Sequence, residues 1–199
     1  MIKIGITGGM GSGKSYISAL LRDHLGVPVY DCDTEAKRLI CEDGSVKQKL
    51  IALAGPDIFR EGTLQKHLLA DFIFTSLLHI RQVNGIVHPA VREDFRKWVG
   101  RQTAAVVAME SAILYESGLD TEVDDVLYVD APEELRIRRA MRRDGSNRMQ
   151  IESRIRMQQS EAQKQKARYV IDNTDATPES LLESLQQILQ RIASEQKTE

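Results

Sequence analysis

The chain has 199 residues, of which 42% are hydrophobic and 28% are charged, and its formal net charge is −2. These values predict a globular protein with one substantial core, and they give no reason to expect a nucleic-acid partner. The sequence has no targeting pattern, no apolar run of the roughly 18 residues that cross a membrane, and only two cysteines. It therefore predicts a cytoplasmic protein without a membrane segment or a disulfide framework.

The first predicted strand covers residues 2–6, and the segment GGMGSGKS at 8–15 follows it with the full G-x-x-x-x-G-K-[ST] spacing. Glycines allow consecutive backbone N–H groups to point into one concavity, and the helix that begins at Lys14 adds the positive end of its dipole. Lys14 can reach the β- and γ-phosphates, and the Ser15 hydroxyl can bind Mg²⁺. This phosphate-binding loop (P-loop) predicts a nucleoside triphosphate site made of Gly11, Ser12, Gly13, Lys14, Ser15 and Tyr16.

Two carboxylates follow the second predicted strand, residues 27–31, which comes after a helix at 14–25. If the chain stays extended, Asp31 and Asp33 point the same way, toward the position of the γ-phosphate. A carboxylate there can take the proton of an attacking hydroxyl, which makes Asp33 a candidate general base. The alternative is that an aspartate caps the helix that begins near Thr34.

Residues 34 to about 99 are predicted to be almost entirely helical, which interrupts the alternation of strands and helices. Breaks are expected at glycines and prolines, namely Gly44, Gly55-Pro56, Gly62, Gly85 and His88-Pro89. The stretch is either an insertion that carries a substrate site or a packing element.

Alternation resumes with predicted strands at 104–110, 124–130 and 167–173, and a C-terminal helix starts near Thr177-Pro178. Five strands interleaved with helices predict an α/β fold with a mainly parallel, doubly wound sheet, whose ligands lie beyond the C-terminal ends of the strands. Glu110 ends one of these strands. It is either an acid that holds the water shell of Mg²⁺ or a simple strand-end charge.

An arginine-rich helix is predicted from Pro132 onward. Arg139 and Arg143 share one face of it at i, i+4, and the residues 145–147 that follow are expected to form a flexible tip. This pattern is typical of a lid that closes over a triphosphate and supplies guanidinium charge. The remaining arginines of this helix are predicted to face solvent: Arg136, Arg138 and Arg142.

Besides the P-loop, several separated segments resemble the dephospho-coenzyme A kinase family of P-loop kinases, in the order YDCDTEAKRL, GTLQKHLLADFIF, VNGIVHPAV, SAILYESG, RRAMRRD and RIRMQ. The resemblance runs almost from end to end. It implies a single P-loop kinase domain with a nucleotide-binding core at 1–33 and 104–199. It also implies a helical coenzyme A subdomain at about 34–100 and a lid at about 139–160.

This resemblance implies transfer of the γ-phosphate of ATP to the ribose 3′-hydroxyl of dephospho-coenzyme A, the final step of coenzyme A biosynthesis, with Mg²⁺ as cofactor. It makes Asp33 the general base, while Lys14 and Arg143 balance charge on the transferring group and Arg139 binds the nucleotide. Ser15 and Glu110 are the implied metal residues. The implied substrate residues are Asp33, Lys66, His88 and Glu116. For His88 the alternative is a plain position at a helix start before Pro89.

Several residues depart from the family pattern, namely Tyr16, Lys66, Ala112, Arg168 and Thr174-Asp175, and they put affinity and base selectivity in question rather than the reaction. Another small-molecule or nucleoside monophosphate kinase is the main alternative. A GTPase-like switch is disfavoured because no Asn-Lys-x-Asp segment follows a late strand. The sequence leaves a monomer and a small homo-oligomer equally open.

Overall fold

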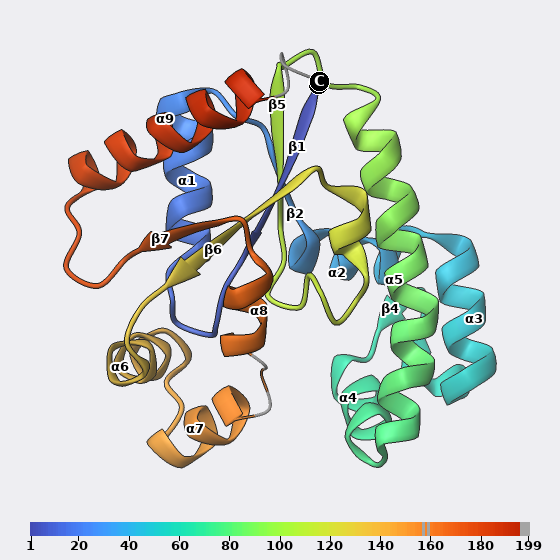
Figure 1. The fold of residues 1–199 in the computed structure, drawn as a ribbon. Coiled ribbons are helices and arrows are strands. Elements are labelled where there is room, and N and C mark those ends of the chain that lie inside the picture. Colours follow the sequence, from blue (N-terminus) through green and yellow to red (C-terminus); the bar gives the residue numbers. More distant parts are fainter. Residues whose placement is uncertain (157, 159, 196–199) are drawn as a thin grey trace. The chain divides into compact units, whose positions relative to one another are not determined.

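Figure 1 shows the computed structural model of the chain, which describes residues 1–156, 158 and 160–195. The chain forms two compact units. Met1–Tyr30 together with Gln102–Glu199 makes the first, which we call the sheet unit, and Asp31–Arg101 makes the second, which we call the helical unit.

A five-stranded sheet with the order β2-β5-β1-β6-β7 gives the sheet unit its name. Its strands are β1 (Ile2–Thr7), β2 (Val29–Asp31), β5 (Val106–Glu110), β6 (Asp125–Asp130) and β7 (Tyr169–Asp172). Strand β1 pairs in parallel with β5 and β6, and β6 pairs in parallel with β7. The predicted α/β fold with a parallel sheet is confirmed. Because these strands are parallel, their carboxyl ends meet at one edge, where the P-loop begins.

One face of this sheet is covered by helices that pack on alternate residues of β1. Its isoleucines point to one face and pack under α1 (Lys14–Leu25) and α9 (Pro178–Glu195), which lie against each other in Figure 1. The buried core on this face consists mainly of Ile2, Ile4, Ile6, Ile17, Leu20, Leu21, Leu127, Val129, Ile171, Leu181, Leu185 and Ile192. The remaining elements of the unit follow β5 and β6: η2 (Leu119–Glu122), α6 (Glu133–Asp144), α7 (Arg148–Arg156) and α8 (Ser160–Lys166).

Arg168 ties the C-terminal helix to the amino ends of two strands. Its Nη1 donates to Asp125 Oδ1 (3.1 Å) and its Nη2 donates to Glu195 Oε2 (2.7 Å). The Tyr169 hydroxyl donates to the same oxygen of Glu195 (3.0 Å). Burial, helped by this hydrogen bond, raises the pKa of Tyr169. Since Asp125 begins β6 and Tyr169 begins β7, Arg168 lies at the edge of the sheet opposite to the P-loop and has a structural role there.

The helical unit contains four α-helices among its described elements: α2 (Cys32–Glu42), α3 (Gly44–Ala54), α4 (Lys66–Phe74) and α5 (Leu77–Val99). A 3-10 turn, η1 (Pro56–Ile58), and a small antiparallel hairpin of β3 (Phe59–Arg60) and β4 (Thr63–Leu64) separate α3 from α4. The predicted breaks near Gly44, Gly55-Pro56 and Gly62 are therefore present.

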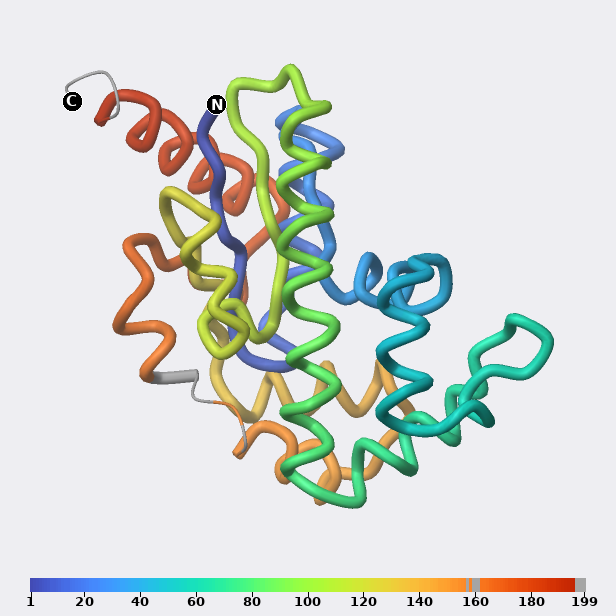
Figure 2. The backbone as a smooth tube through the Cα atoms, turned by 90° about the vertical axis from the view of Figure 1, so that its right-hand side faces the viewer, coloured from blue at the N-terminus to red at the C-terminus, as the bar shows by residue number. Residues whose placement is uncertain are grey.

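The predicted breaks at Gly85 and His88-Pro89 are wrong, because α5 continues through both, as the unbroken green helix of Figure 2 shows. The apolar residues Val83, Val87, Val91 and Phe95 recur every four residues and are buried. Their burial outweighs the cost of about 3 kcal/mol for an interior proline, whose ring is exposed here. Of the helices within residues 1–156, 158 and 160–195, each falls short of the length and apolar content that crossing a membrane requires.

Candidate active site

The P-loop fits against its surroundings so closely that several of its positions require glycine, among them Gly11 and Gly13. Gly11 has φ 76° and Gly13 has φ 101°, which lie in the region that favours glycine. A Cβ on Gly11 would collide with the backbone oxygen of Arg136 in α6, and a Cβ on Gly13 would collide with the Asn173 side chain. The loop is therefore held in shape by α6 on one side and by the end of β7 on the other.

Helix α1 begins directly after this loop and presents an open N-terminus. Its N-cap is Gly13, which has no side chain to bond the first N–H groups of the helix. Lys14 lies back over the loop, and its Nζ donates to the carbonyls of Gly8 (2.9 Å) and Gly9 (3.2 Å). The helix dipole, the N–H groups and the ammonium thus gather positive charge around one concavity, which is the chemistry of a polyphosphate site. Tyr16 is exposed on the first turn of the same helix.

Ser15 and Glu110 meet at the carboxyl edge of the sheet. Glu110 is the last residue of β5 and is paired in register with Ile6, at the end of β1. The Ser15 hydroxyl donates to Glu110 Oε1 at 2.8 Å. A hydroxyl and a carboxylate are oxygen ligands of the kind Mg²⁺ takes, directly or through water, so these residues fit the cation. Within the part of the chain that the structure describes, no cluster of three or more His, Cys, Asp or Glu forms a cage. Few protein ligands are usual for Mg²⁺ bound with a nucleotide.

Asp31 and Asp33 have different environments because the chain turns helical between them. Helix α2 begins at Cys32, so the expected extended chain, with both carboxylates on one side, is wrong. Asp31 is the N-cap: its side chain accepts from the N–H groups of Asp33 (3.0 Å) and Thr34 (3.3 Å) and from the Thr34 hydroxyl (2.7 Å). The Asp33 carboxylate is exposed in the first turn and makes no hydrogen bond or ion pair with the other described residues.

Arg139 and Asn173 support the P-loop from the side of α6 and β7. The Arg139 guanidinium donates to the carbonyl of Asn173 (3.0 Å) and, more weakly, to those of Thr174 and Ser12 (both 3.5 Å). Asn173, which is 5% exposed, donates through Nδ2 to the Ser12 carbonyl at 2.8 Å. The structure therefore brings Arg139 beside the loop, as a nucleotide role requires. Asn173 was missed, although its position at the end of a buried strand was a signal.

Arg143 lies one turn further along α6 and is 63% exposed. Its Nε donates to Asp144 Oδ1 (2.7 Å) and its Nη2 donates to Oδ2 (3.1 Å), which lowers the pKa of the Asp144 carboxyl. The spacing of Arg139 and Arg143 places them on one helix face, but their guanidinium groups have different hydrogen-bond partners. An exposed ion pair of this kind contributes little stability and rearranges easily.

The expectation that Arg136 faces solvent is wrong, whereas Arg138 and Arg142 are exposed as predicted. Arg136 is 6% exposed, beside Ile137 and Ala140, because this face of α6 covers the P-loop. The spacing of arginines could not reveal which face of the helix packs inward.

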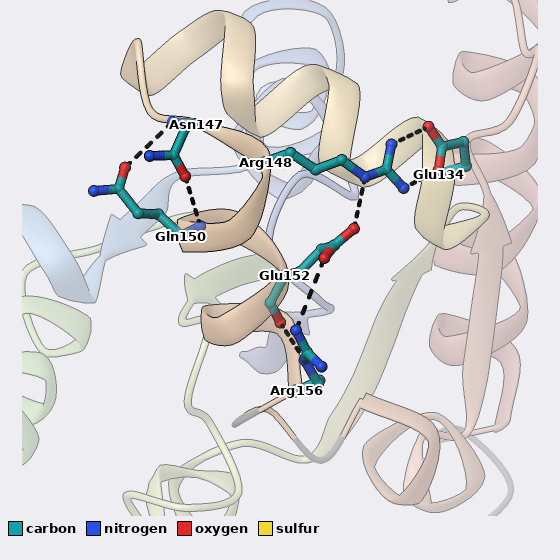
Figure 3. Close-up of polar contacts among 6 residues, drawn as sticks. All are labelled: Glu134, Asn147, Arg148, Gln150, Glu152 and Arg156. Carbon is teal, nitrogen blue, oxygen red and sulfur yellow. Dashed lines mark hydrogen bonds and ion pairs between the residues drawn. The ribbon is translucent and has the colours of Figure 1, made fainter.

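The residues expected to form a flexible tip connect α6 to α7 in a helical hairpin. Gly145 ends α6 in the left-handed conformation. Asn147 and Gln150 form a reciprocal cap at the start of α7, in which each side chain accepts from the backbone N–H of the other (3.0 and 3.2 Å; Figure 3). The two helices share a small core of Ile137, Ala140, Ile151 and Ile155.

Arg148 joins the start of α7 to the first turn of α6. Its Nη1 and Nη2 donate to the two oxygens of Glu134 (2.9 and 2.7 Å), and its Nε donates to Glu152 (2.6 Å), as Figure 3 shows. The hydrogen bond from Arg148 lowers the pKa of Glu134. This fork links the start of α7 to the first turn of α6, but both side chains are about half exposed, so the small apolar core between the helices contributes more to their packing.

The implied substrate residues are divided between the units. In the helical unit, Lys66 is exposed at the start of α4, and His88 is half-buried in the middle of α5, so its alternative position at a helix start is wrong. Burial, and then the nearby charge of Arg92, lowers the pKa of His88. In the sheet unit, Glu116 follows β5 and accepts a hydrogen bond from Gln163 Nε2.

Polar residues that follow α7 were also missed by the sequence reasoning. The Met10 N–H of the P-loop donates to Gln158 Oε1 (2.7 Å), and Lys164 Nζ donates to Asp130 Oδ2 (2.6 Å) at the end of β6. These pairs are separated by 148 and 34 positions in the chain, so no local pattern could connect them.

Comparison with known proteins gives consistent results. A family model described as dephospho-CoA kinase matches residues 2–179. A dephospho-CoA kinase of Bacteroides fragilis is 47% identical over 194 residues, which cover 96% of this chain and 92% of that protein. A Thermus thermophilus protein of known crystal structure is 34% identical, with a TM-score of 0.81 and coverage of 96% of this chain and 97% of the other. The structure of a Campylobacter jejuni dephospho-CoA kinase shares the fold, with a TM-score of 0.69, 19% identity and 98% coverage of both chains.

Proposed function

The chain belongs to the dephospho-CoA kinase family, and from this premise we propose how its residues carry out the reaction. The reaction transfers the γ-phosphoryl group of ATP to the ribose 3′-hydroxyl of dephospho-CoA and gives CoA and ADP, the final step of CoA biosynthesis. The observation that carries the proposal is the P-loop with its open helix N-terminus, beside the hydrogen-bonded pair of Ser15 and Glu110.

The triphosphate binds in the P-loop. The N–H groups between Gly11 and Ser15, together with the dipole of α1, hold the β-phosphate, and Lys14 exchanges its carbonyl partners for phosphate oxygens. Tyr16 and Arg139 border the nucleotide, since Arg139 already lies beside the Ser12 carbonyl. The positive groups are fixed by the fold before the nucleotide arrives, so little free energy is lost in ordering them.

Ser15 and Glu110 hold Mg²⁺, Ser15 through its hydroxyl and Glu110 through its carboxylate or through water. When bound, the cation neutralises charge on the β- and γ-phosphates.

Asp33 is the general base, because its carboxylate is exposed and unengaged, whereas that of Asp31 is committed to the cap of α2. Asp33 takes the proton of the ribose 3′-hydroxyl. The 3′-oxygen then forms its bond to the γ-phosphorus, and the bond from the γ-phosphorus to the bridging oxygen of ADP breaks. Lys14, with Arg143 after it leaves Asp144, stabilises the charge of the transferring group.

Lys66, His88 and Glu116 are the residues proposed to bind the acceptor substrate. A lowered pKa keeps His88 neutral near pH 7, so it recognises substrate by hydrogen bonding rather than by charge. The enzyme is proposed to work in the cytoplasm, as a monomer or a small homo-oligomer.

The test is ADP release by the purified protein with ATP and Mg²⁺, comparing dephospho-CoA with AMP, CMP, adenosine and no acceptor. ADP release that depends on dephospho-CoA, with a product heavier by one phosphate, is expected. Stimulation by AMP or CMP instead would identify a nucleoside monophosphate kinase, and equal release without acceptor would identify an NTPase.

A further inference from the structure

The short helix α8 holds the loop that follows β5. Gln163 is 3% exposed, and its Nε2 donates to Glu116 Oε1. One turn along, the Lys166 Nζ lies over the Tyr115 ring, 5.5 Å from its centroid. Two neighbouring residues of the loop are thus held by side chains from one face of α8, which comes more than 40 positions later in the chain.

The chemistry of the two groups determines which one donates in the hydrogen bond between Gln163 and Glu116. An ionised carboxylate accepts hydrogen bonds and has none to donate, so the Gln163 amide must present its nitrogen to Glu116. A hydrogen bond to a charged group is stronger and more directional than a neutral one. It engages one oxygen of the carboxylate, and the other oxygen, Oε2, accepts no side-chain hydrogen bond from the residues that the structure describes. That oxygen remains available for a donor on a ligand.

The position of α8 is itself fixed by the sheet. Lys164 Nζ donates to Asp130 Oδ2 at 2.6 Å, and Asp130 is the last residue of β6. Since Lys164 is the next residue after Gln163, this pair anchors the amide at the carboxyl edge of the sheet. The orientation of Glu116 is therefore set by the fold before any substrate binds.

We propose that Gln163 is a positioning residue for the acceptor substrate. Its amide holds the Glu116 carboxylate in the orientation in which the second oxygen accepts a hydrogen bond from an O–H or N–H group of dephospho-CoA. The proposal rests on the proposed role of Glu116 in substrate binding. It adds a residue that never touches the substrate and still sets its affinity.

The test compares Gln163→Leu with Gln165→Leu, a matched control because Gln165 is exposed on the same helix. Loss of a hydrogen bond to a charged group is expected to raise the KM for dephospho-CoA about tenfold to a hundredfold. The KM for ATP and the kcat at saturation should stay within about twofold of wild type, since neither the P-loop nor the general base is altered. The control should match wild type in all three constants.

A second variant, Gln163→Glu, separates positioning from simple damage to the fold. Two adjacent carboxylates raise the pKa of one of them, so the pair shares a proton at low pH and regains a hydrogen bond. The KM defect of this variant for dephospho-CoA should therefore shrink as the pH is lowered from about 8 to about 5.5. A defect that is independent of pH would contradict the proposal.

Glu116→Gln distinguishes the substrate role of Glu116 from the positioning role of Gln163. If this variant has the wild-type KM for dephospho-CoA, the substrate role of Glu116 is wrong and the positioning role falls with it. If Glu116→Gln raises that KM while Gln163→Leu leaves it unchanged, Glu116 binds substrate without help and only the positioning role is overturned.

Discussion

At the residue scale, Asp31 has a structural role as the cap of α2, whereas Asp33, two positions later, is the proposed general base. Asp31 accepts backbone hydrogen bonds at the N-terminus of α2, while the Asp33 carboxylate is exposed and unengaged. We expect Asp33→Asn to lower kcat about 10²- to 10⁴-fold with nearly unchanged substrate binding, because the variant cannot accept the proton. Steady-state kinetics with a binding isotherm for dephospho-CoA checks this.

Asp31→Ala provides the contrast. Loss of the cap should reduce the stability of the helical unit by about 0.5–2 kcal/mol, while Asp31→Asn, which still caps, should be close to wild type. If Asp33→Asn kept wild-type turnover and Asp31→Asn lost it, the assignment of the base would be reversed.

We expect His88 to make the stability of the helical unit depend on pH. Burial, and then Arg92, lowers the pKa of His88 in the folded protein below its ordinary value of 6.5, so folding favours the neutral ring. Above pH 6.5 the neutral His88 leaves the free energy of unfolding at its full value. As the pH falls below 6.5, this free energy decreases, because the proton binds more tightly to His88 in the unfolded chain. Urea unfolding at pH 7.5 and pH 5.5 should show that the free energy of unfolding decreases less for His88→Gln than for wild type when the pH is lowered. His67→Gln, at an exposed position of α4, should lose as much as wild type.

At the scale of elements, the α6–α7 hairpin depends on the cap that begins α7. Asn147→Ala removes an acceptor for the Gln150 N–H and should destabilise α7 by about 1 kcal/mol, whereas Asn147→Asp keeps an equally good cap. Hydrogen exchange of the α7 amides should accelerate in the alanine variant alone. Unchanged exchange would mean that the small core around Ile151 and the Arg148 fork hold the helix by themselves.

Some of these elements could be predicted from the sequence and others could not. The P-loop, the strand before it and α1 were predictable because the pattern that defines them is local. Eight residues contain the glycine turn, the lysine ammonium group and the serine hydroxyl. Helix α5 was not predictable, since a proline is a strong local signal and only tertiary burial of Val87 and Val91 overrides it. The start of α2 was misjudged by two residues, so the carboxylates of Asp31 and Asp33 do not share an extended face, and Asp31 is the aspartate that caps the helix.

The contacts of the candidate site residues were harder to predict than their positions. Residue type and spacing led us to propose Lys14, Ser15, Glu110 and Arg139, and the structure places all four at or near the carboxyl edge of the sheet. Buried Arg136 was missed because its burial depends on which face of α6 meets the P-loop. The contact of Asn173 with Ser12 spans 161 positions, and β6 lies between β1 and β7 in the sheet, so neither local sequence nor strand neighbours reveal it.

At the scale of the whole molecule, ligand binding should stabilise the fold in two separable steps. ATP with Mg²⁺ at about 100 times its Kd adds about 2.7 kcal/mol to the free energy of unfolding, which for a chain of this size raises the Tm by roughly 5–10 °C. Removal of Mg²⁺ with EDTA should abolish part of this rise. Glu110→Gln should remove the Mg²⁺-dependent part and keep the rest, while Glu183→Gln, on the exposed side of α9, should change neither. Differential scanning calorimetry measures both parts, and an undiminished Mg²⁺ effect in Glu110→Gln would contradict the metal role.

The order of the strands also has a consequence for synthesis on the ribosome. Strand β1 leaves the ribosome first, yet both of its neighbours, β5 and β6, lie more than 95 residues later in the chain. At about 5–20 residues per second, the unpaired backbone edges and the apolar side chains of β1 wait roughly 5–20 seconds for their partners. Residues 31–101 are complete during that interval and make mostly local helical contacts. We therefore expect the middle of the nascent chain to fold before β1 finds its partners, which makes the newly made isoleucines of β1 a natural target for chaperones.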